Sequence, residues 1–312
     1  MAEPVARVGV IGGSGLYRME GLVDVEEHRV ETPFGPPSDA IVVGTLGGVR
    51  VAFLPRHGLG HRHSPTAVPV RANIYALKSL GVERVVSVSA VGSMKYELAP
   101  LDLVVPDQLF DRTVARPRSF FDAESGCAVH VSIAEPYCPE LRAALLDAAG
   151  GPTIAARVHD GGTYLCIEGP QFSTRGESRI YRGWGVDVIG MTALPEARLA
   201  REAELCYATL ALVTDYDVWK EDEEPVTVQI VVERLQRNAG VAQQVLRELI
   251  PRLAAERTCA CGAALADAII TDPARIPPET RSRLGLLLDR YLDATGTAGE
   301  PPPLPTGTPR KQ

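Results

Sequence analysis

Short runs of apolar, largely β-branched residues alternate with stretches of helical periodicity along most of this 312-residue chain. This alternation is typical of α/β folds, in which helices cover both faces of a sheet, so we predict an α/β protein. The expected strands, each bounded by Gly, Pro or Asp, are 8–11, 41–45, 49–54, 84–89, 103–105, 186–191 and 205–214. The expected helices are 69–80, 195–204 and 226–255, and Leu46-Gly47-Gly48 is expected to form a hairpin turn.

The composition limits the possible classes of function. With 45% hydrophobic residues the chain can bury a large core, and no apolar run approaches the roughly 20 residues needed to cross a bilayer. The N-terminus, MAEPVARVGV, lacks the features of a secretory signal, so we expect a cytoplasmic protein. The net charge of −7 and the absence of any Lys/Arg block argue against a nucleic-acid or membrane-surface role. An anionic ligand must therefore be bound by local groups.

The last residues, 296–312, differ in composition from the rest of the chain. Their sequence, GTAGEPPPLPTGTPRKQ, is rich in Pro, Gly and Thr and cannot form a core. We therefore expect one folded domain over residues 1–295, followed by a disordered tail.

A glycine-rich turn follows the first expected strand, in VGVIGGSGLY at residues 8–17. Gly12-Gly13-Ser14-Gly15 lets backbone amides approach an anion, and the Ser14 hydroxyl is a further donor. A dinucleotide site is disfavoured, because position 18 is Arg where G-x-G-x-x-G needs its third glycine, and no crossover helix pattern follows. A tight turn without a ligand is the plain alternative.

Basic groups gather at the end of another strand, in FLPRHGLGHRHS at residues 53–64. Arg56 can clamp a phosphate in a bidentate way, and His57, His61 and His63 follow it in a glycine-containing loop. A metal site is one rival, but no H-E-x-x-H motif or nearby carboxylate supports it, and Arg56 would repel a cation. We favour an anion site over a metal site and over a solvated loop.

A third strand end, VVSVSAVGSM at residues 85–94, carries small hydroxyl side chains. Ser87 and Ser89 lie on one face by the period of two, and Ala90 with Gly92 leaves room for a ligand beside the backbone. Ligands of open α/β sheets gather at the carboxyl ends of strands, and three such ends here offer anion donors. We therefore expect these segments to form one anion site.

Two loops in the second half of the chain add candidate residues. Glu168-Gly169-Pro170 predicts a turn after an apolar strand and presents Phe172 and Ser173. Phe172 is either a core anchor or, beside an anion site, a ring that stacks on a flat base. Gly190-Met191-Thr192 follows another expected strand and precedes a helix.

The stretch LALVTDYDVW, residues 210–219, places Asp215 and Asp217 two positions apart at the end of an apolar run. Strand periodicity predicts that both carboxyl groups lie on one side and Tyr216 on the other. Two close carboxylates resist ionising together, so one of them is expected to retain a proton.

A set of motifs occurs in order over about residues 8–250: IGGSGLY, TPFG, RHGLGHRHSP, ANIYALKSLGV, DQLFDRT, AEPYCPE, IEGPQFSTRGES, GMTALPEA and TDYDVWKEDEE. On these motifs the chain resembles the trimeric purine nucleoside phosphorylase family. The resemblance implies a single α/β domain with a central mixed sheet, or distorted barrel, flanked by helices. It also implies a homotrimer that needs no cofactor or metal. The implied reaction is the cleavage of methylthioadenosine by inorganic phosphate to adenine and methylthioribose 1-phosphate.

The same resemblance implies a role for each matching residue. The residues expected around phosphate are Ser14, Arg56, His57, Ser89, Ala90 and Thr192. Met191 is expected under the ribose, with Phe172 and Ser173 beside the base. The methylthio group is expected against Val226, Val228, Val231 and Val232, for which core packing is the alternative role, and against His130 from a neighbouring subunit.

The implied chemistry assigns a role to the two aspartates, Asp215 and Asp217. Phosphorolysis passes through an oxocarbenium-like transition state, so the enzyme must hold phosphate at C1′ and relieve the negative charge on the departing base. A carboxylic acid can donate to purine N7, and a carboxylate can accept from the adenine amino group. We predict Asp215 as the donor to N7 and Asp217 as the partner of the amino group, with an exchange of these parts left open.

The base preference rests on the same two residues. A 6-oxopurine presents an acceptor, O6, and would favour an amide such as Asn at this site, so two aspartates predict adenine. Gly190 argues the other way, because some methylthioadenosine enzymes of this family carry Asn there and oxopurine enzymes carry Gly. A 6-oxopurine nucleoside or methylthioinosine phosphorylase is therefore the alternative.

The six cysteines are too few for a disulfide scaffold in a chain of this length. Cys259-Ala260-Cys261 places two thiols one residue apart, and a disulfide across them would be strained and redox-labile. Two thiols without another nearby ligand pair do not make a zinc site. We therefore expect an incidental pair of thiols.

Overall fold

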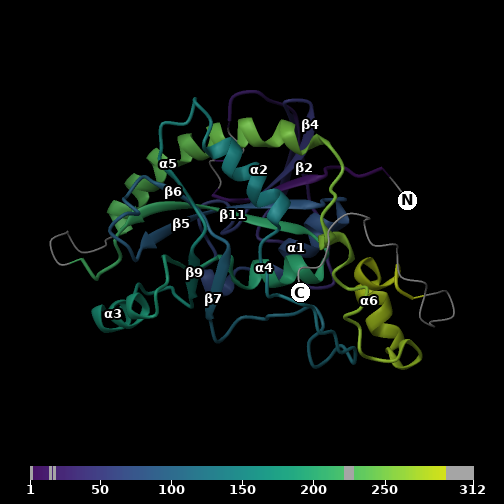
Figure 1. Cartoon of the computed structure of the whole chain (residues 1–312). Helices are drawn as coiled ribbons and strands as arrows, with labels where there is room; N and C mark the ends of the chain where they lie inside the picture. Colours follow the sequence, from purple (N-terminus) through teal and green to yellow (C-terminus); the bar gives the residue numbers. More distant parts are fainter. Residues whose placement is uncertain (1–2, 14–15, 17–18, 221–227, 293–312) are drawn as a thin grey trace.

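The computed structural model describes residues 3–13, 16, 19–220 and 228–292 (Figure 1). Within these ranges the strands form one eleven-stranded mixed sheet. The strands are β1 (Val8–Gly12), β2 (Leu22–His28), β3 (Ile41–Leu46), β4 (Val49–Pro55), β5 (Arg84–Ser93), β6 (Leu103–Val105), β7 (Gln108–Arg112), β8 (Val158–Asp160), β9 (Thr163–Ile167), β10 (Val188–Gly190) and β11 (Cys206–Asp215). The α-helices are α1 (Val70–Ser79), α2 (Pro139–Ala149), α3 (Arg175–Gly183), α4 (Ala193–Glu202), α5 (Val228–Leu249) and α6 (Pro278–Leu288).

The long strand β5 is the centre of the sheet. Along one edge it pairs in parallel with β11 over almost its whole length. Its other edge is shared, with β1 parallel to its first half and β10 antiparallel to its end. Beyond β1 the sheet continues through β4, β3 and β2, and beyond β10 through β9 and β7. The carboxyl ends of the parallel strands β1, β4, β5 and β11 therefore lie at one edge, where ligands of α/β sheets bind.

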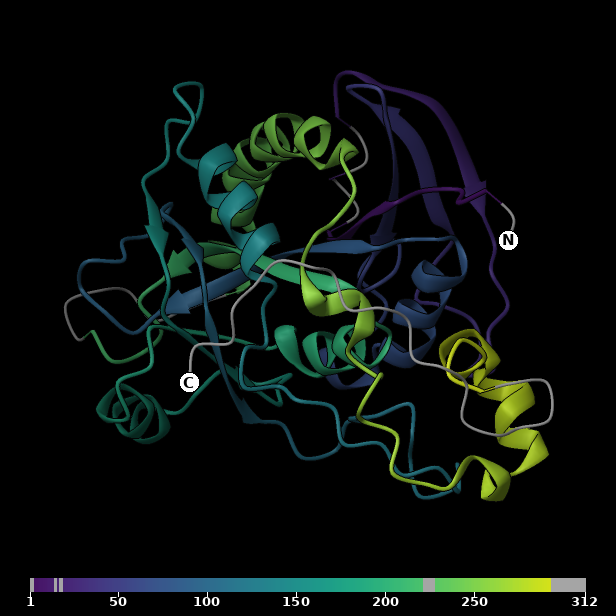
Figure 2. The same cartoon turned by 45° about the vertical axis from the view of Figure 1, so that its right-hand side comes forward.

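Two apolar cores cover the two faces of the sheet. On one face α2 and α5 pack through residues such as Leu141 and Leu246. On the other face α1, α4 and α6 pack through residues such as Leu77, Leu199 and Leu284. Figure 1 shows α2 and α5 above the sheet and α1 and α4 below it, and Figure 2 shows α6 at the opposite end of the molecule from α3. Because both faces are covered, the central strands are apolar on both sides, which explains the continuous apolar runs in the sequence.

The expected α/β fold is confirmed, and each expected strand and helix is present, the strand 103–105 with the expected bounds and the others with shifted ends. The hairpin at Leu46 is also confirmed: Leu46 pairs with Val49, and Gly47 and Gly48 both have positive φ, as a two-residue hairpin turn requires. The expected helix 226–255 is α5 followed by a 3₁₀ helix, Ile250–Ala254. No helix in the described ranges is long and apolar enough to cross a membrane. The expected tail, 296–312, lies outside the described residues.

Elements that the sequence did not reveal have identifiable local causes. Strand β2 is exposed along most of its length, so its pattern lacks an apolar face. Helix α3 begins with a capping box, in which the Thr174 hydroxyl accepts from the Glu177 amide and the Glu177 carboxylate accepts from the Thr174 amide. Only Ser178 and Tyr181 of its nine residues are buried, so the segment offers too few apolar positions to mark a core-facing helix.

The prediction for the cysteines is wrong. Cys259 and Cys261 are not an isolated pair, because the fold brings Cys138 and Cys206 to them from the starts of α2 and β11. The ligand atoms of these four residues all lie within 4.8 Å of one another. The sequence could not show this, since the partners are distant along the chain.

Candidate active site

A buried ion pair lies where β4 ends. The Arg56 guanidinium donates from Nε to Glu196 Oε1 at 2.5 Å and from Nη2 to Glu196 Oε2 at 3.1 Å. It also donates to the Val88 carbonyl at 2.9 Å, to Ser87 Oγ at 2.7 Å and to the Ile11 carbonyl at 3.4 Å. Burial works against the charge of Arg56, but the Glu196 carboxylate overrides it and the pKa of the guanidinium is raised. Arg56 therefore stays charged and fixed in position.

Glu196 was missed as a site residue. It lies on α4, is only 1% exposed, and also accepts a hydrogen bond from the Tyr207 hydroxyl at 3.0 Å. The available signal was an acidic residue just inside the helix that follows Gly190-Met191-Thr192, but nothing in the local pattern indicates that it faces Arg56.

Three hydroxyl groups meet beside this ion pair. Ser89 Oγ on β5 lies 2.8 Å from Thr192 Oγ1 and 3.2 Å from the Tyr164 hydroxyl of β9. The predicted phosphate residues Ser89 and Thr192 are thus in direct contact, and half-exposed Ala90 follows Ser89. Ser87, on the same face of β5, contacts Arg56, so the predicted period of two is confirmed for this strand.

Gly190 has a structural explanation in Tyr164. A Cβ atom at position 190 would lie 2.0 Å from the Tyr164 hydroxyl oxygen and 2.6 Å from its Cζ. Tyr164 is fully buried, so it has no room to retreat. The absence of a side chain at 190 therefore follows from the presence of Tyr164, whichever base the site accepts.

Gly190→Ala is expected to destabilise the protein by about 1–3 kcal/mol, because the added methyl group overpacks a filled core. Displacing Tyr164 should also disturb the hydroxyl cluster and raise KM for phosphate. Urea unfolding and phosphate titration measure the two effects. The double variant Gly190→Ala/Tyr164→Leu, which removes the clashing ring, should recover most of the stability; an unchanged single variant would contradict the steric argument.

His57 follows Arg56 and has one ring nitrogen occupied. Its Nδ1 lies 2.9 Å from the His63 carbonyl oxygen, and its ring stacks on His61 with centroids 4.2 Å apart. Burial, and then the nearby Arg56 charge, lower the pKa of His57 to about 4. At neutral pH the ring is therefore uncharged, with Nδ1 as the donor to the carbonyl and Nε2 as an acceptor.

The acid pair lies at the end of β11, next to β5. A bulge between Val213 and Asp215 shifts the register, so that Asp215 pairs with Gly92. Asp217 follows with φ of 50°, in the left-handed region. A Cβ atom at Gly92 would lie 2.8 Å from Asp215 Oδ1 and 3.4 Å from Asp217 Cβ. Both aspartates therefore lie against Gly92, which confirms their predicted proximity, although a bulge and a turn cause it rather than regular strand alternation.

The two carboxyl groups differ in their hydrogen bonds. Asp215 accepts from the Thr214 hydroxyl at 2.7 Å and from the Asp217 amide at 2.8 Å, one bond on each oxygen. Asp217 Oδ2 is buried and has no hydrogen-bond partner within the described part of the chain. Burial raises the pKa of Asp217 to about 6 although the nearby Ser178 hydroxyl and Val218 amide act to lower it, and the Asp215 carboxylate adds to the rise. Asp217 is thus the member of the pair that takes up a proton more readily than an ordinary aspartic acid.

Arg116 joins the two loops that carry the other predicted residues, a role that the sequence did not reveal. Its guanidinium donates to the Met191 and Leu194 carbonyl oxygens at 2.6 and 2.8 Å. It also donates to the Glu168 carboxylate at 3.1 Å. The loop after β9 and the loop before α4 are therefore held together.

The side chains of the loop after β9 differ in their exposure to solvent. Phe172 is 41% exposed, so it is not the core anchor that the plain alternative required. Ser173 Oγ is buried without a hydrogen-bond partner among the described residues. Met191 packs closely on the same loop, since a Cβ at Gly169 would lie 2.5 Å from its sulfur.

The remaining predicted residues are those that the resemblance places at the phosphate loop, at the methylthio group and at a neighbouring subunit. Ser14 and Val226 lie outside the described residues, as do the side chains of Val228 and Val231. Val232 on α5 is 44% exposed, which argues against a core role. His130 is exposed, and its amide donates to the Ala268 carbonyl at 2.8 Å.

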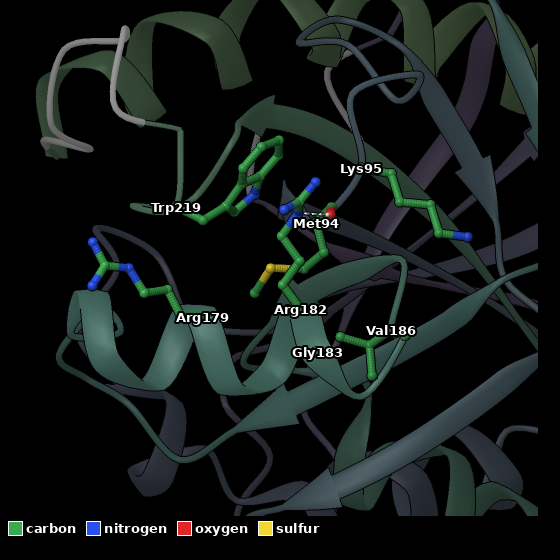
Figure 3. Close-up of a pocket in the computed structure, with 8 residues that line it drawn as sticks. Met94, Lys95, Arg179, Arg182, Gly183, Val186 and Trp219 are labelled. Carbon is green, nitrogen blue, oxygen red and sulfur yellow. Dashed lines mark hydrogen bonds between the residues drawn. The ribbon is translucent and has the colours of Figure 1, made fainter.

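A surface pocket lies beside the acid pair but contains none of the predicted residues. Figure 3 shows Met94, Arg182 and Trp219 among its lining. The Arg182 guanidinium lies over the Trp219 ring at 4.2 Å and donates to the Met94 carbonyl at 3.2 Å. Because Trp219 follows Asp217 by two residues, this packing anchors the turn that carries the acid.

The sheet and the cluster at its carboxyl edge define a class of protein. The model of the phosphorylase superfamily matches residues 7–251, so the chain belongs to that superfamily. More particularly, it is similar to S-methyl-5′-thioadenosine phosphorylases. The Gloeobacter violaceus protein is 53% identical, over 93% of this chain and 98% of its own length. The Geobacter sulfurreducens protein is 54% identical, over 91% and 99%.

Solved structures agree with the sequence relatives. A methylthioadenosine phosphorylase from an antarctic soil metagenomic library superimposes with a TM-score of 0.87 at 50% identity, covering 92% of this chain and all of that one. The methylthioadenosine phosphorylase of Schistosoma mansoni, solved in complex with adenine, gives a TM-score of 0.80 at 37% identity, over 85% and 99%. The mixed sheet with flanking helices is thus the fold of these enzymes.

Proposed function

We propose that this protein is a pentosyltransferase that cleaves S-methyl-5′-thioadenosine with inorganic phosphate, yielding adenine and S-methyl-5-thio-ribose 1-phosphate. The observation that carries the proposal is that Asp215 and Asp217 both lie against Gly92, and that Gly92 is on the same strand, β5, as the Ser89 hydroxyl. The residues proposed to contact the base and those proposed to bind phosphate thus lie next to each other along β5. The names of the relatives, and the adenine bound in the Schistosoma structure, support the same reaction.

Phosphate is held, in this proposal, by Ser14, Arg56, His57, Ser89, Ala90 and Thr192. An oxygen of the phosphate attacks C1′ while the bond from C1′ to N9 breaks, and the bonding electrons leave with the base. Fixed donors stabilise the transition state because they need no reorganisation. Arg56 is fixed by Glu196, and Ser89 and Thr192 are fixed by each other and by Tyr164.

The departing adenine needs a proton at N7. We predicted Asp215 for this part, and the hydrogen bonds of the pair favour the exchange that the sequence left open. Both Asp215 oxygens accept hydrogen bonds, which suits a carboxylate, whereas Asp217 has a raised pKa and an unpartnered oxygen. We therefore propose Asp217 as the proton donor and Asp215 as its charged partner. The unpartnered Ser173 hydroxyl is a further group for the base, with Phe172 stacked on it.

The remaining proposed residues contact the ribose and the methylthio group of the substrate. Met191 lies under the ribose, and Val226, Val228, Val231 and Val232 border the methylthio group. The exposed position of His130 suits a contact with a neighbouring subunit's site, so we propose a homotrimer.

Residues 1–295 form the single catalytic domain. We propose the cytoplasm as its compartment, since six cysteines in a chain of this length do not make a disulfide scaffold.

Steady-state phosphorolysis of methylthioadenosine, adenosine, inosine and methylthioinosine tests the proposal. We expect the highest kcat/KM with methylthioadenosine and a strict requirement for phosphate. A kcat/KM that favours inosine or methylthioinosine would establish the 6-oxopurine alternative instead. Nucleoside binding without any release of base would show a binding protein.

A further inference from the structure

Four cysteine sulfurs converge at the end of the sheet opposite to the acid pair. Cys138 precedes α2, Cys206 begins β11, and Cys259 and Cys261 lie at the 3₁₀ helix Ala260–Ala263. All four sulfurs lie within 4.8 Å of one another, and those of Cys206 and Cys259 are 3.2 Å apart. Three of the residues are buried and Cys259 is half-buried. Such a compact, shielded set of four thiols is a donor set for a thiophilic metal ion.

We propose that these four cysteines bind one zinc ion in a tetrahedral site. Zinc in structural sites takes four ligands, with Zn–S bonds of about 2.3 Å, which places the sulfurs of a regular tetrahedron about 3.8 Å apart. The cluster matches this spacing without large movement of the backbone. Soft thiolates select zinc over calcium or magnesium, so the chemistry of the donors also identifies the ion.

The surroundings of the sulfurs suit thiolates. A zinc ion with four thiolates carries a net charge of −2, which needs nearby donors. Arg201 Nη1 lies 3.5 Å from the Cys261 sulfur, and Arg257 Nη1 lies 3.9 Å from the Cys206 sulfur. The Leu141 amide donates to the Cys138 sulfur at 3.5 Å, at the N-terminus of α2. Donors of this kind orient metal ligands and offset their charge.

The position of the cluster indicates a structural role. Cys206 and Asp215 are the two ends of β11, about 30 Å apart at the rise of an extended strand, so the ion would not contact the substrate. The cluster instead connects two parts of the fold: the segment with Cys259 and Cys261, which precedes α6, and the main sheet at Cys206. Glu140 at the start of α2 already accepts hydrogen bonds from the Thr258 and Cys259 amides, at 3.0 and 2.9 Å. A zinc ion would hold the start of α2 and the segment around Cys259 together at the same place.

The test uses the full-length protein, produced with zinc and purified under reducing conditions. After exhaustive desalting, elemental analysis should find one zinc per chain, and native alkylation should spare the four clustered thiols. Replacement by Co²⁺ should give the thiolate-to-cobalt charge-transfer band and the visible bands of a tetrahedral site. Cys261→Ser should retain below about a tenth of the zinc, because loss of one thiolate opens the site. Cys127→Ser removes a buried thiol outside the cluster and should keep one zinc per chain.

Two results on the wild-type protein would overturn the proposal, even if the variants fail to fold. The first is metal-free protein with six thiols that react freely with an alkylating agent after denaturation. The second is metal-free protein in which alkylation without reduction shows disulfides among the four cysteines. With zinc present, a chelator should lower Tm by several degrees in wild type and in Cys127→Ser, but not in Cys261→Ser.

Discussion

Asp217→Asn is expected to lower kcat/KM for S-methyl-5′-thioadenosine by more than about tenfold while making the protein more stable at neutral pH. The amide can still donate a hydrogen bond, but it cannot deliver a proton to N7. The stability gain has a physical cause, since burial raises the pKa of Asp217 to about 6. Its φ of 50° is a conformation that Asn also tolerates, so the backbone adds no penalty.

The pH dependence follows from the sign of this shift. Between the ordinary aspartate value of 3.8 and the folded value of about 6, the folded protein holds a proton that the unfolded chain has lost. The contribution of Asp217 to the free energy of unfolding therefore falls as pH rises through this window, by about 1–3 kcal/mol in total. Asp217→Asn should match wild type below pH 4 and exceed it above pH 6, by a few degrees in Tm.

Asp215→Asn is the matched comparison for this prediction. It should also lower kcat/KM for methylthioadenosine by more than about tenfold, because the charged partner is lost. It should not stabilise the protein, since both Asp215 oxygens accept hydrogen bonds that one amide cannot all satisfy. If Asp215→Asn stabilised the protein and Asp217→Asn did not, the roles of the two acids would be those first predicted from the sequence.

Glu196→Gln is expected to reduce the free energy of unfolding by about 3–5 kcal/mol, because it leaves the Arg56 guanidinium buried without its counter-ion. Arg56 is 3% exposed and Glu196 1%, so water cannot replace the lost carboxylate. The amide of Gln keeps one acceptor oxygen for the Tyr207 hydroxyl and Ser87, but its NH2 group would face the Arg56 Nε–H. Chemical denaturation of the two proteins measures the effect.

Inorganic phosphate, a dianion, should partly restore the stability of the Glu196→Gln variant. If Arg56 faces phosphate, inorganic phosphate should raise the Tm of Glu196→Gln by more than it raises that of wild type, since the ligand supplies the missing negative charge. Glu202→Gln, on the same helix, is the control. Glu202 is a buried acid whose pKa burial raises to about 7, and it accepts hydrogen bonds from the Ser119 hydroxyl and the Phe120 amide. The nearby Arg198 forms its ion pair with Asp111, so replacing Glu202 leaves that arginine with a carboxylate partner. An equal loss of stability in both variants would refute the ion-pair argument.

The fold class could be predicted from the sequence because burial on both faces leaves a direct trace. Strands such as β1 and β11 are buried throughout and mostly apolar, and the glycines of the β3–β4 hairpin mark a turn with positive φ. Exposed or short strands such as β2 and β8 leave no such trace, because their side chains are not selected for a core. The motifs that carry Arg56 and Asp215 lie at the ends of β4 and β11, at one edge of the sheet.

Local spacing and composition are enough to predict the α/β class, the segments that carry Ser89 and Arg56, and an acid pair at Asp215 and Asp217. The groups that oppose these residues come from distant segments and become apparent in the folded chain. Arg56 meets Glu196 across 140 positions of sequence, Gly190 is dictated by Tyr164, and Cys138 reaches Cys259 from 121 positions away. The physical reason is that side-chain spacing along a strand is local, whereas the neighbour of a strand is set by the order in which the sheet assembles.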